Sequence, residues 1–366
     1  MTAFSTRPRV TFVIDSFMVG GTELAALRTY SLLRSEADIS LVHFHTVGPL
    51  FDEYRVLGAQ LHHVQLYGVS DPRNVIAIAK LRKLLTRLRP QVIHSHDAYS
   101  NMVVLGTQIP WRTAPWISSR RWLDQIVRPS HARLNHVAFQ RSSAVTVNSR
   151  AVAEHMTAVE GIASTRITVV PNFVELPELM ISRKPAGTPV VIGMVSRLTP
   201  IKRHDLALRA LRIIRDEGHA VQLVIVGEGI ARAEIEGLIR TLGLDDCVRL
   251  DGERRGGPAL HQNFDITLTT SDSEGSPNSV LEAMAAARPV VATDVGGTRD
   301  LIRPAVDGFL VPAGNVNAIA DALRTLVASA ATRKSMGTSA RERAAAEFSP
   351  AAIATALLSL YQRLSR

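Results

Sequence analysis

The sequence predicts an α/β protein built from two doubly wound, Rossmann-like domains that face each other across a cleft. The chain has 366 residues, and single hydrophobic cores stop growing at roughly 250–300 residues, so two domains are favoured over one. Short apolar segments alternate with amphipathic helical segments along both halves, a pattern typical of parallel sheets covered on both faces. A proline-rich break at residues 174–189 separates the two halves.

In the first half, short apolar runs indicate strands, and the segments between them include residues at helical spacing. We expect helices at 21–34 and 74–89, and strands at 9–15, 39–45, 91–96, 143–149 and 167–172. Pro90 ends the second helix, because proline lacks the amide hydrogen that the helix needs.

The break contains three prolines, one glycine and no clear periodicity, so we interpret it as an interdomain linker. The alternation then restarts, with helices expected at 204–218, 231–243 and 279–287 and strands at 189–196, 222–229, 248–252, 265–271 and 289–294. We therefore place the domains at 1–180 and 186–348. Ligands of such sheets bind beyond the carboxyl ends of the strands, so we expect the deepest site between the two sheets.

Composition restricts the class of partner. Residues 1–185 carry 21 Lys and Arg against 13 Asp and Glu, whereas residues 186–366 carry 21 against 20. A basic first half favours an anionic lipid or a phosphate-bearing acceptor, and no nucleic-acid module is recognisable. The single cysteine, Cys247, excludes an internal disulfide framework and a cysteine-rich metal site. The N-terminal residues lack the apolar region of a signal peptide, so we expect a cytoplasmic protein, peripheral at the inner face of the cell membrane at most.

Two motifs in the first half lie where ligands bind. Gly20 and Gly21 follow the first strand and would let the backbone approach a ligand, although the glycine pair on its own favours a plain tight turn. His94 and His96 end the strand at 91–96 and share one face of it. An imidazole that hydrogen-bonds sugar hydroxyls competes here with a structural histidine, and no third metal ligand is evident.

Two motifs in the second half indicate an anion site. Arg197 and Lys202 follow the first strand of that half, where a guanidinium fork and an ammonium suit a diphosphate, although a solvated basic loop has the same composition. After the strand at 265–271, Ser276 suits a helix N-cap and Pro277 the first helical position, so the amides around Ser276, Pro277 and Asn278 are available to an anion. Glu274 precedes this cap, and Glu282 lies eight residues later inside the helix. A carboxylate suits a ribose diol, and the alternatives are dipole compensation for Glu274 and a surface salt bridge for Glu282.

The segment EGSPNSVLEAMAAARPVVATDVGG resembles the E-x7-E segment of the family 4 retaining glycosyltransferases, which have the GT-B fold. The segments VGGTELAAL, IHSHDAYSNMV and GMVSRLTPIKRHDLALRAL resemble that family's glycine loop, strand-end histidine motif and basic donor segment. The matches run in the family's order from about residue 12 to about residue 310.

This resemblance implies a hexosyltransferase that uses a UDP- or GDP-sugar and a glycan or lipid-linked acceptor, in cell-surface polysaccharide or glycolipid synthesis. It implies retention of configuration, no metal, no cofactor and no protein nucleophile. It implies that Gly20 and Gly21 contact the donor and that His96 lies near the reacting centre. It implies that Arg197 and Lys202 bind the diphosphate and stabilise it as the leaving group, and that the amides of Ser276, Pro277 and Asn278 contact phosphate. It implies that Glu274 binds the hexose and Glu282 the ribose. It also implies that helix 350–366 joins the first domain.

The chain departs from the family pattern near the donor segment. Arg203 stands where glycine commonly follows the lysine, and we expect this additional cation to affect donor choice. Two other functions remain open, a nucleotide-sugar 2-epimerase of the same fold and a non-catalytic sugar-nucleotide binder. The retained Arg197, Lys202, Glu274 and Glu282 argue against the binder.

Two further basic features belong to the first half. The helix at 74–89 has a leucine stripe (Leu81, Leu84, Leu85 and Leu88) and a separate basic face, so it either contacts an anionic membrane or simply covers the sheet. Arg120, Arg121 and Arg128 are candidates to meet an acidic acceptor or are surface charge.

Overall fold

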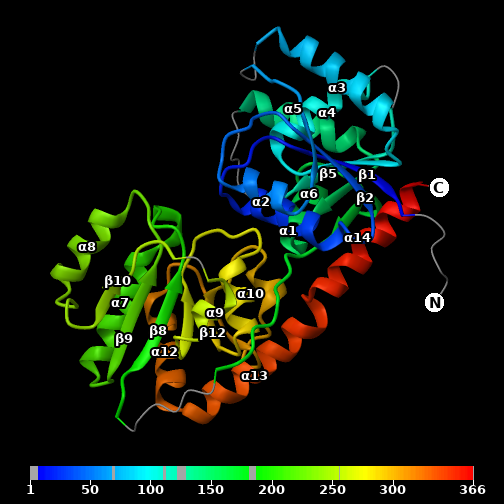
Figure 1. Ribbon diagram of the computed structural model, residues 1–366. Coiled ribbons are helices and arrows are strands. Elements are labelled where there is room, and N and C mark those ends of the chain that lie inside the picture. Colours follow the sequence, from blue (N-terminus) through cyan, green and yellow to red (C-terminus); the bar gives the residue numbers. More distant parts are fainter. Residues whose placement is uncertain are drawn as a thin grey trace. The chain divides into compact units, whose positions relative to one another are not determined.

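The computed structural model describes residues 7–67, 71–109, 113–121, 129–180, 187–254 and 256–365. Contacts divide the chain into two compact units, and the first of them is discontinuous. Unit 1 comprises Met1–Pro171 and Ile353–Arg366, and unit 2 comprises Asn172–Ala352. Figure 1 follows the chain through both units.

Unit 1 contains one parallel sheet of seven strands in the order β3-β2-β1-β4-β5-β6-β7. The strands are β1 (Arg9–Ile14), β2 (Asp38–His43), β3 (Gln60–His63), β4 (Val92–Ser95), β5 (Trp116–Arg120), β6 (Ala144–Val147) and β7 (Ile167–Val169). The helices are α1 (Gly21–Leu33), α2 (Leu50–Val56), α3 (Asn74–Leu88), α4 (Ala98–Thr107), α5 (Pro129–Arg141), α6 (Arg150–Ala158), the short 3-10 helix η1 (Ser164–Arg166) and most of α14 (Pro350–Ser365).

Unit 2 contains a parallel sheet of six strands in the order β10-β9-β8-β11-β12-β13. The strands are β8 (Val190–Val195), β9 (Val221–Val226), β10 (Val248–Leu250), β11 (Ile266–Thr269), β12 (Val290–Thr293) and β13 (Gly308–Val311). The helices are the short 3-10 helix η2 (Pro200–Lys202), α7 (His204–Asp216), α8 (Arg232–Thr241), α9 (Pro258–His261), α10 (Asn278–Ala285), α11 (Thr298–Leu301), α12 (Val316–Ala328) and α13 (Ala330–Glu347).

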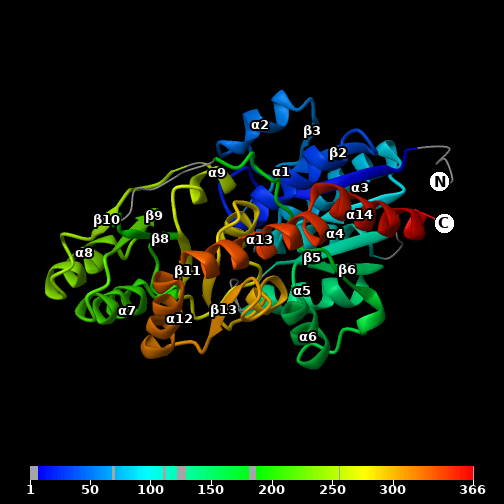
Figure 2. The ribbon, with the colours of Figure 1, turned by 90° about the horizontal axis from the view of Figure 1, so that it is seen from below.

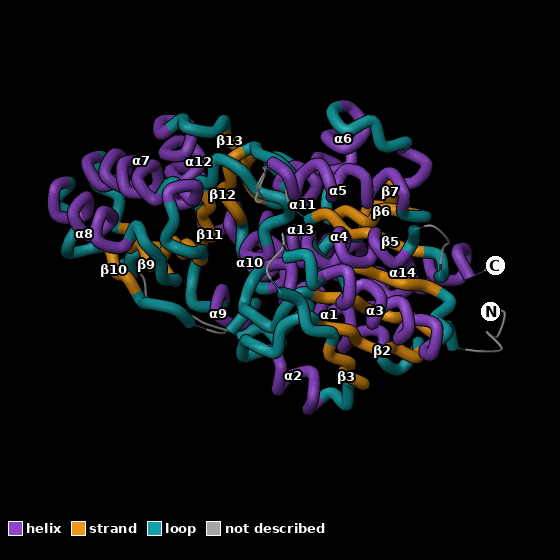
Figure 3. Tube along the Cα trace, turned by 90° about the horizontal axis from the view of Figure 1, so that it is seen from above, coloured by secondary structure: helices purple, strands orange, loops and turns teal. Residues whose placement is uncertain are grey.

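Apolar side chains project from both faces of each sheet, so helices cover both faces (Figure 3). In β12, Val291 joins the core formed with α7, α8 and α12, whereas Val290 and Ala292 join the core formed with α10 and α13. The alternation follows from the two-residue period of a strand. The predicted fold class, with two doubly wound parallel α/β domains, is thereby confirmed for each unit.

The chain returns to unit 1 through α14 (Figure 2). Tyr361 of α14 is fully buried, and its hydroxyl lies 2.8 Å from Nδ1 of His94 in β4. This contact fixes the helix to the middle of the unit 1 sheet.

The segment expected to be a linker is, over its described residues, part of unit 2. The amide of Val174 donates to the carbonyl of Phe348, and the amide of Met180 donates to Oε1 of Gln262. The division between the units accordingly falls at Asn172, before the proline-rich residues rather than after residue 180. Residues 181–186 lie outside the described part of the chain.

One stretch, Ala330–Ser365, is long and apolar enough by length and composition to cross a membrane. It comprises α13 and α14, and a third of its most apolar window is buried in the fold. Core helices of soluble proteins pass the same test, so this observation is weak evidence for a membrane span.

Candidate functional site

The unit 2 sheet has a topological switch point between β8 and β11. From β8 the chain continues outward through β9 to β10, and it then returns to β11 on the other side of β8. Ligands of doubly wound sheets bind outside the carboxyl ends of the strands at such a point. Residues 196–203 follow β8 and residues 270–277 follow β11, so two of the motifs predicted from sequence meet here.

At this point the structure brings Lys202 and Glu274 into direct contact. The ammonium Nζ of Lys202 lies 2.5 Å from Oε1 of Glu274, and the hydroxyl of Ser271 donates to the same oxygen at 2.7 Å. The Lys202 side chain is 18% exposed and the Glu274 side chain 11% exposed. The two charges therefore form a largely buried ion pair with one side open.

Backbone contacts fix both members of the pair. The hydroxyl of Thr270 donates to the carbonyls of Lys202 and Arg203, at 3.0 and 2.8 Å. The amide of Asp272 donates to the carbonyl of Ile201, and the amide of Gly297 donates to the carbonyl of Glu274. The loops that carry the two charges are thus bound to each other and to the loop after β12.

Arg197 occupies a different environment. It is exposed at the end of β8, and no hydrogen bond or ion pair among the described residues involves its guanidinium. The structure therefore places Arg197 at the predicted strand end and does not bring it into contact with the Lys202–Glu274 pair.

The start of α10 differs from the prediction by one residue. Pro277 is the N-cap, with extended backbone angles and no side-chain cap, so Ser276 is not the cap and Asn278 is the first helical residue. A proline ring fixes φ but offers no capping oxygen, and the first recorded hydrogen bonds of the helix run from Val280 and Leu281 to the carbonyl of Pro277. The hydroxyl of Ser276 is buried and has no hydrogen-bond partner within the described chain.

Glu282 lies on α10 beside a glycine-containing turn. Its Oε2 is 3.8 Å from Nε2 of His261, a fully buried histidine whose Nδ1 contacts the hydroxyl of Thr267. Burial, reinforced by Arg288, lowers the pKa of His261 to about 3, so this imidazole is neutral. A Cβ added at Gly257 would lie 3.8 Å from Oε1 of Glu282, and that glycine has φ of +49°.

Arg203 does not provide the additional donor-site cation expected from the sequence. Its guanidinium contacts Asp205 through Nε at 2.9 Å and Asp272 through Nη1 at 3.1 Å, so two carboxylates already balance its charge. Its φ is +50°, in the left-handed region that favours glycine. The backbone thus adopts a conformation that favours glycine, while the side chain joins the loops after β8 and β11.

The unit 1 sheet has its switch point between β1 and β4, where the glycine and histidine motifs lie. Gly20 is the N-cap of α1 and Gly21 is its first residue. A Cβ on Gly20 would lie 2.3 Å from Oε2 of Glu23, whereas a Cβ on Gly21 would meet no atom within 4 Å. The close approach at Gly20 is to the chain's own glutamate, and Gly21 leaves open space.

The two histidines of β4 and its end differ in their contacts. Their rings stack with centroids 4.2 Å apart, as expected for side chains on one face of a strand. His94 contacts the hydroxyls of Tyr361, Ser119 and Thr146, whereas neither ring nitrogen of His96 has a partner within the described chain. Burial lowers the pKa of His94 to about 3, and it lowers the pKa of His96 well below its usual value. His94 is therefore a structural residue, and His96 is a neutral imidazole with both nitrogens unused.

Sequence reasoning assigned no role to three acidic or basic residues at this switch point. Oδ1 of Asp15, directly after β1, lies 3.1 Å from Nδ1 of His45, and the amide of Asp15 donates to Oδ2 of Asp97 at 2.9 Å. Burial raises the pKa of Asp97 to about 7, and the neighbouring charge of Asp15 acts in the same direction. The position of each residue just beyond a strand was the available signal, because strand ends at a switch point line the site.

The structure also corrects the assignment of the basic residues after β5. Arg120 is 5% exposed and pairs with Glu160, so it is neither surface charge nor available to an acceptor. Burial lowers the pKa of Arg121 to about 10. Arg128 lies outside the described residues.

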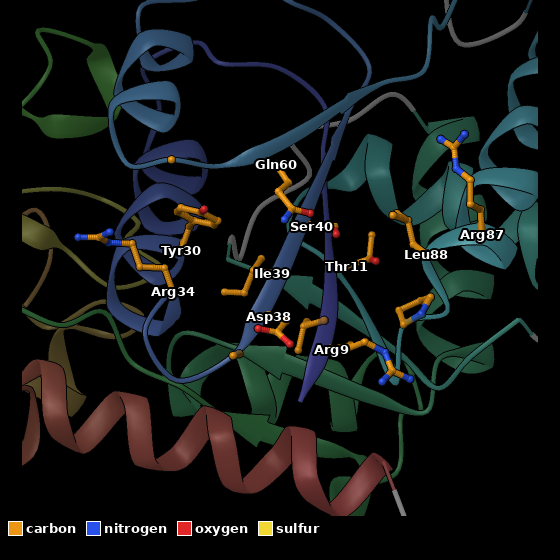
Figure 4. A pocket seen from close by; sticks show the side chains of 14 residues that line it. Arg9, Thr11, Tyr30, Arg34, Asp38, Ile39, Ser40, Gln60, Arg87 and Leu88 are labelled. Carbon is orange, nitrogen blue, oxygen red and sulfur yellow. The ribbon is translucent and has the colours of Figure 1, made fainter. Parts of the chain in front are cut away.

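A cavity of about 480 Å³ opens at the opposite edge of the unit 1 sheet (Figure 4). It is lined by the amino-terminal ends of β1, β2 and β3 and by α1 and α3, including Arg9, Asp38 and Gln60. Because it lies at the amino ends of the strands, it is not part of the switch-point site. Among the described residues, no group of three or more His, Cys, Asp or Glu side chains is arranged to hold a metal ion.

Comparison with known proteins gives two family matches in the order of the two units. The Glycosyl transferase 4-like domain model matches residues 20–172, and the Glycosyl transferases group 1 model matches residues 177–343. Poly(ribitol-phosphate) alpha-N-acetylglucosaminyltransferase of Staphylococcus aureus (strain COL) is 31% identical over 196 residues, 53% of this chain and 39% of that protein. The amylovoran biosynthesis glycosyltransferase AmsK of Erwinia amylovora is 28% identical over 222 residues, 58% of this chain and 54% of that protein. The chain thus spans about two fifths and about half of these relatives.

Among solved structures, Anabaena Alr3699/HepE in complex with UDP has a TM-score of 0.84 at 20% identity, covering 97% of this chain and 100% of that one. At this identity the likeness establishes the GT-B fold. The two matched ranges together span most of the chain, so unit 2 is similar to the group 1 glycosyltransferases and unit 1 to the Glycosyl transferase 4-like domain.

Proposed function

We propose that this protein transfers a sugar from a nucleoside-diphosphate donor to a saccharide or lipid-linked acceptor, with retention of configuration and without a metal ion. The matches to two glycosyltransferase models support this activity, as do the names of the relatives, a poly(ribitol-phosphate) alpha-N-acetylglucosaminyltransferase and an amylovoran biosynthesis glycosyltransferase. The observation that carries the proposal is the Lys202–Glu274 pair at the switch point of unit 2.

The donor fits this edge of unit 2 by charge and geometry. Lys202 and Arg197 supply positive charge for a diphosphate that gains negative charge as it leaves. The amides at the start of α10 add hydrogen-bond donors for the phosphates. Glu282 is placed farther along the same helix, where a carboxylate accepts two hydrogen bonds from a ribose diol. UDP is the first nucleotide to test, since a structural neighbour was crystallised with it.

The chemistry assigned to these residues is electrostatic. Glu274 accepts hydrogen bonds from hexose hydroxyls, while the cations stabilise the departing diphosphate in the role that a divalent metal has in other transferases. In unit 1, Gly21 leaves open space at the start of α1, whereas the ring nitrogens of His96 are buried and can meet a sugar hydroxyl only if neighbouring side chains move. Retention then requires no covalent intermediate on the protein, because the acceptor attacks the face from which the diphosphate departs.

Replacing Glu274 by Ala tests the assignment. Thermal shift against UDP-, GDP- and other nucleotide sugars first identifies the donor, because a ligand selective for the folded state raises its melting temperature. The Glu274→Ala variant is then expected to release nucleoside diphosphate about 10²- to 10³-fold more slowly in the presence of acceptor, while it still binds the nucleotide. Unchanged turnover contradicts the role of Glu274, and donor epimerised at C2 without acceptor indicates the epimerase instead.

A further inference from the structure

If the proposed function is correct, the Lys202–Glu274 contact links the residue that binds the diphosphate of the donor to the residue that binds its hexose. The two residues assigned to different parts of the donor, the diphosphate and the hexose, lie 2.5 Å apart. Oε1 of Glu274 accepts from both Lys202 and Ser271, so the other oxygen, Oε2, is the one available to hexose hydroxyls. An ammonium has three protons, so Lys202 can contact the carboxylate and a phosphate oxygen at the same time.

We propose that Lys202 is the shared counter-ion of Glu274 and the donor diphosphate, and that this pair selects the sugar-bearing nucleotide over the free nucleoside diphosphate. When hexose is present, its hydroxyls donate to Oε2 and satisfy the carboxylate. When hexose has been transferred, the terminal phosphate carries one further negative charge, and it lies beside a carboxylate that no hydroxyl satisfies. Glu274 therefore weakens the binding of the product and favours its release.

The surroundings of the pair support this arrangement. Both side chains are less than one fifth exposed, and charges interact more strongly there than in water. The loops that carry them are joined by the Thr270 and Asp272 hydrogen bonds, which hold the backbones of the two loops close together. Removing one member of such a pair leaves the other as an uncompensated buried charge.

Isothermal titration with UDP and with UDP-N-acetylglucosamine tests the inference without an acceptor. GDP and GDP-mannose replace them if the wild-type protein binds guanosine nucleotides instead. In the Glu274→Gln variant, we expect UDP to bind about fivefold more tightly and the nucleotide sugar about fivefold more weakly, so that the ratio of the two Kd values changes by roughly 25-fold.

Glu282→Gln is the matched control. Glu282 lies on α10 with a similar exposure of 13%, against 11% for Glu274, but its assigned ligand is the ribose that both nucleotides carry. This variant is expected to weaken UDP and the nucleotide sugar by the same factor. A ratio that changes equally in the two variants, or in neither, overturns the inference.

The Lys202→Met variant tests the shared counter-ion directly. We expect it to weaken UDP binding by about tenfold or more, because Glu274 then faces the diphosphate unpaired. Adding Glu274→Gln is expected to recover at least about fivefold of that loss, and a double variant no better than Lys202→Met contradicts the pairing. If Lys202→Met does not fold, as judged by its melting curve, the comparison of Glu274→Gln with Glu282→Gln decides alone. A wild-type protein that binds none of these nucleotides refutes the proposed function itself, whereas binding without the change in ratio refutes only this inference.

Discussion

The switch points of the two sheets lie at equivalent places in the two units, but the candidate residues there differ in charge. At the unit 2 switch point, the candidate residues are charged, lie on loops and balance one another, as Lys202 and Glu274 do. At the unit 1 switch point, His94 and His96 are fully buried and neutral, because burial lowers the pKa of each. The comparison teaches that the same sheet topology places a charged pair on the loops of one unit and buried, neutral imidazoles at a strand end of the other, beside the contact between Asp15 and His45.

The largest expected effect concerns the buried imidazole of unit 1. Replacing His94 by Gln is expected to lower the free energy of unfolding by about 2–4 kcal/mol at pH 7.5, because three hydroxyl contacts are lost. The pKa of His94 is about 3 when folded and near 6.5 when unfolded, so the unfolded chain takes up a proton below pH 6.5 and the native state does not. Wild-type stability therefore decreases as the pH is lowered below 6.5. The difference in unfolding free energy between wild type and variant shrinks by about 1.4 kcal/mol per pH unit, and it reaches zero roughly 1.5 to 3 units below pH 6.5.

Native-state hydrogen exchange of the β4 and β5 amides at pH 7.5, 6.5 and 5.5 measures this gap within unit 1. Asp97, with its pKa raised to about 7, is present in both proteins, and its contribution cancels to first order. The corresponding variant for unit 2 is His204→Gln, because burial lowers the pKa of His204 to about 4 and this imidazole is therefore also neutral at pH 7.5. A gap that stays constant with pH in unit 1 would mean that His94 is not held neutral.

A smaller effect tests the contact between α14 and β4. Tyr361→Phe removes the hydroxyl that lies 2.8 Å from His94, and we expect a loss of about 1–2 kcal/mol, measured as a lower melting temperature of unit 1. Tyr54→Phe is the matched control, because the Tyr54 hydroxyl is buried without a partner within the described chain and its removal is expected to be neutral or stabilising. Nucleotide affinity in unit 2 is expected to remain unchanged in both variants. Equal losses in the two variants would show that the Tyr361 contact contributes nothing specific.

The smallest expected effect concerns charge outside the sites. In α3, Leu81, Leu84 and Leu85 are buried, while Lys80 and Lys83 are exposed, so the helix is amphipathic as predicted. We propose that this face contacts anionic membranes weakly, at up to about 1 kcal/mol per basic residue. Lys83→Gln is expected to reduce cosedimentation with phosphatidylglycerol vesicles at low salt, and Arg209→Gln, an exposed site in unit 2, is not. Equal partition into neutral and anionic vesicles would exclude the contact.

Most strands with a continuous apolar run were predicted from the sequence, although β13 was missed despite its apolar residues 309–311. The strands β1, β4, β8 and β9 coincide with apolar runs in the sequence, so their existence was predictable. β3 was missed because it is an edge strand of partly exposed polar residues, and β5 because its second half is the buried polar run Ser118–Arg120. These two strands take their conformation from their neighbours in the sheet rather than from their own composition.

The same distinction applies to the site. The residue types at Lys202, Glu274 and Glu282 were recognisable from their motifs, but the contact between Lys202 and Glu274 was not. It joins residues 72 positions apart, and it exists because β11 pairs with β8 rather than with β10. Similarly, the role of His94 depends on Tyr361, which is 267 positions away.

The return of the chain to unit 1 at Ile353 imposes an order on synthesis. The residues of unit 2 are all joined to the chain before Tyr361 is, so unit 1 lacks the side chain that fills the space beside His94 until synthesis is nearly complete. A fragment ending at Pro171 would carry the whole unit 1 sheet and yet remain unfinished. Although its sheet is translated first, unit 1 can complete its core only after the C-terminal helix has been made.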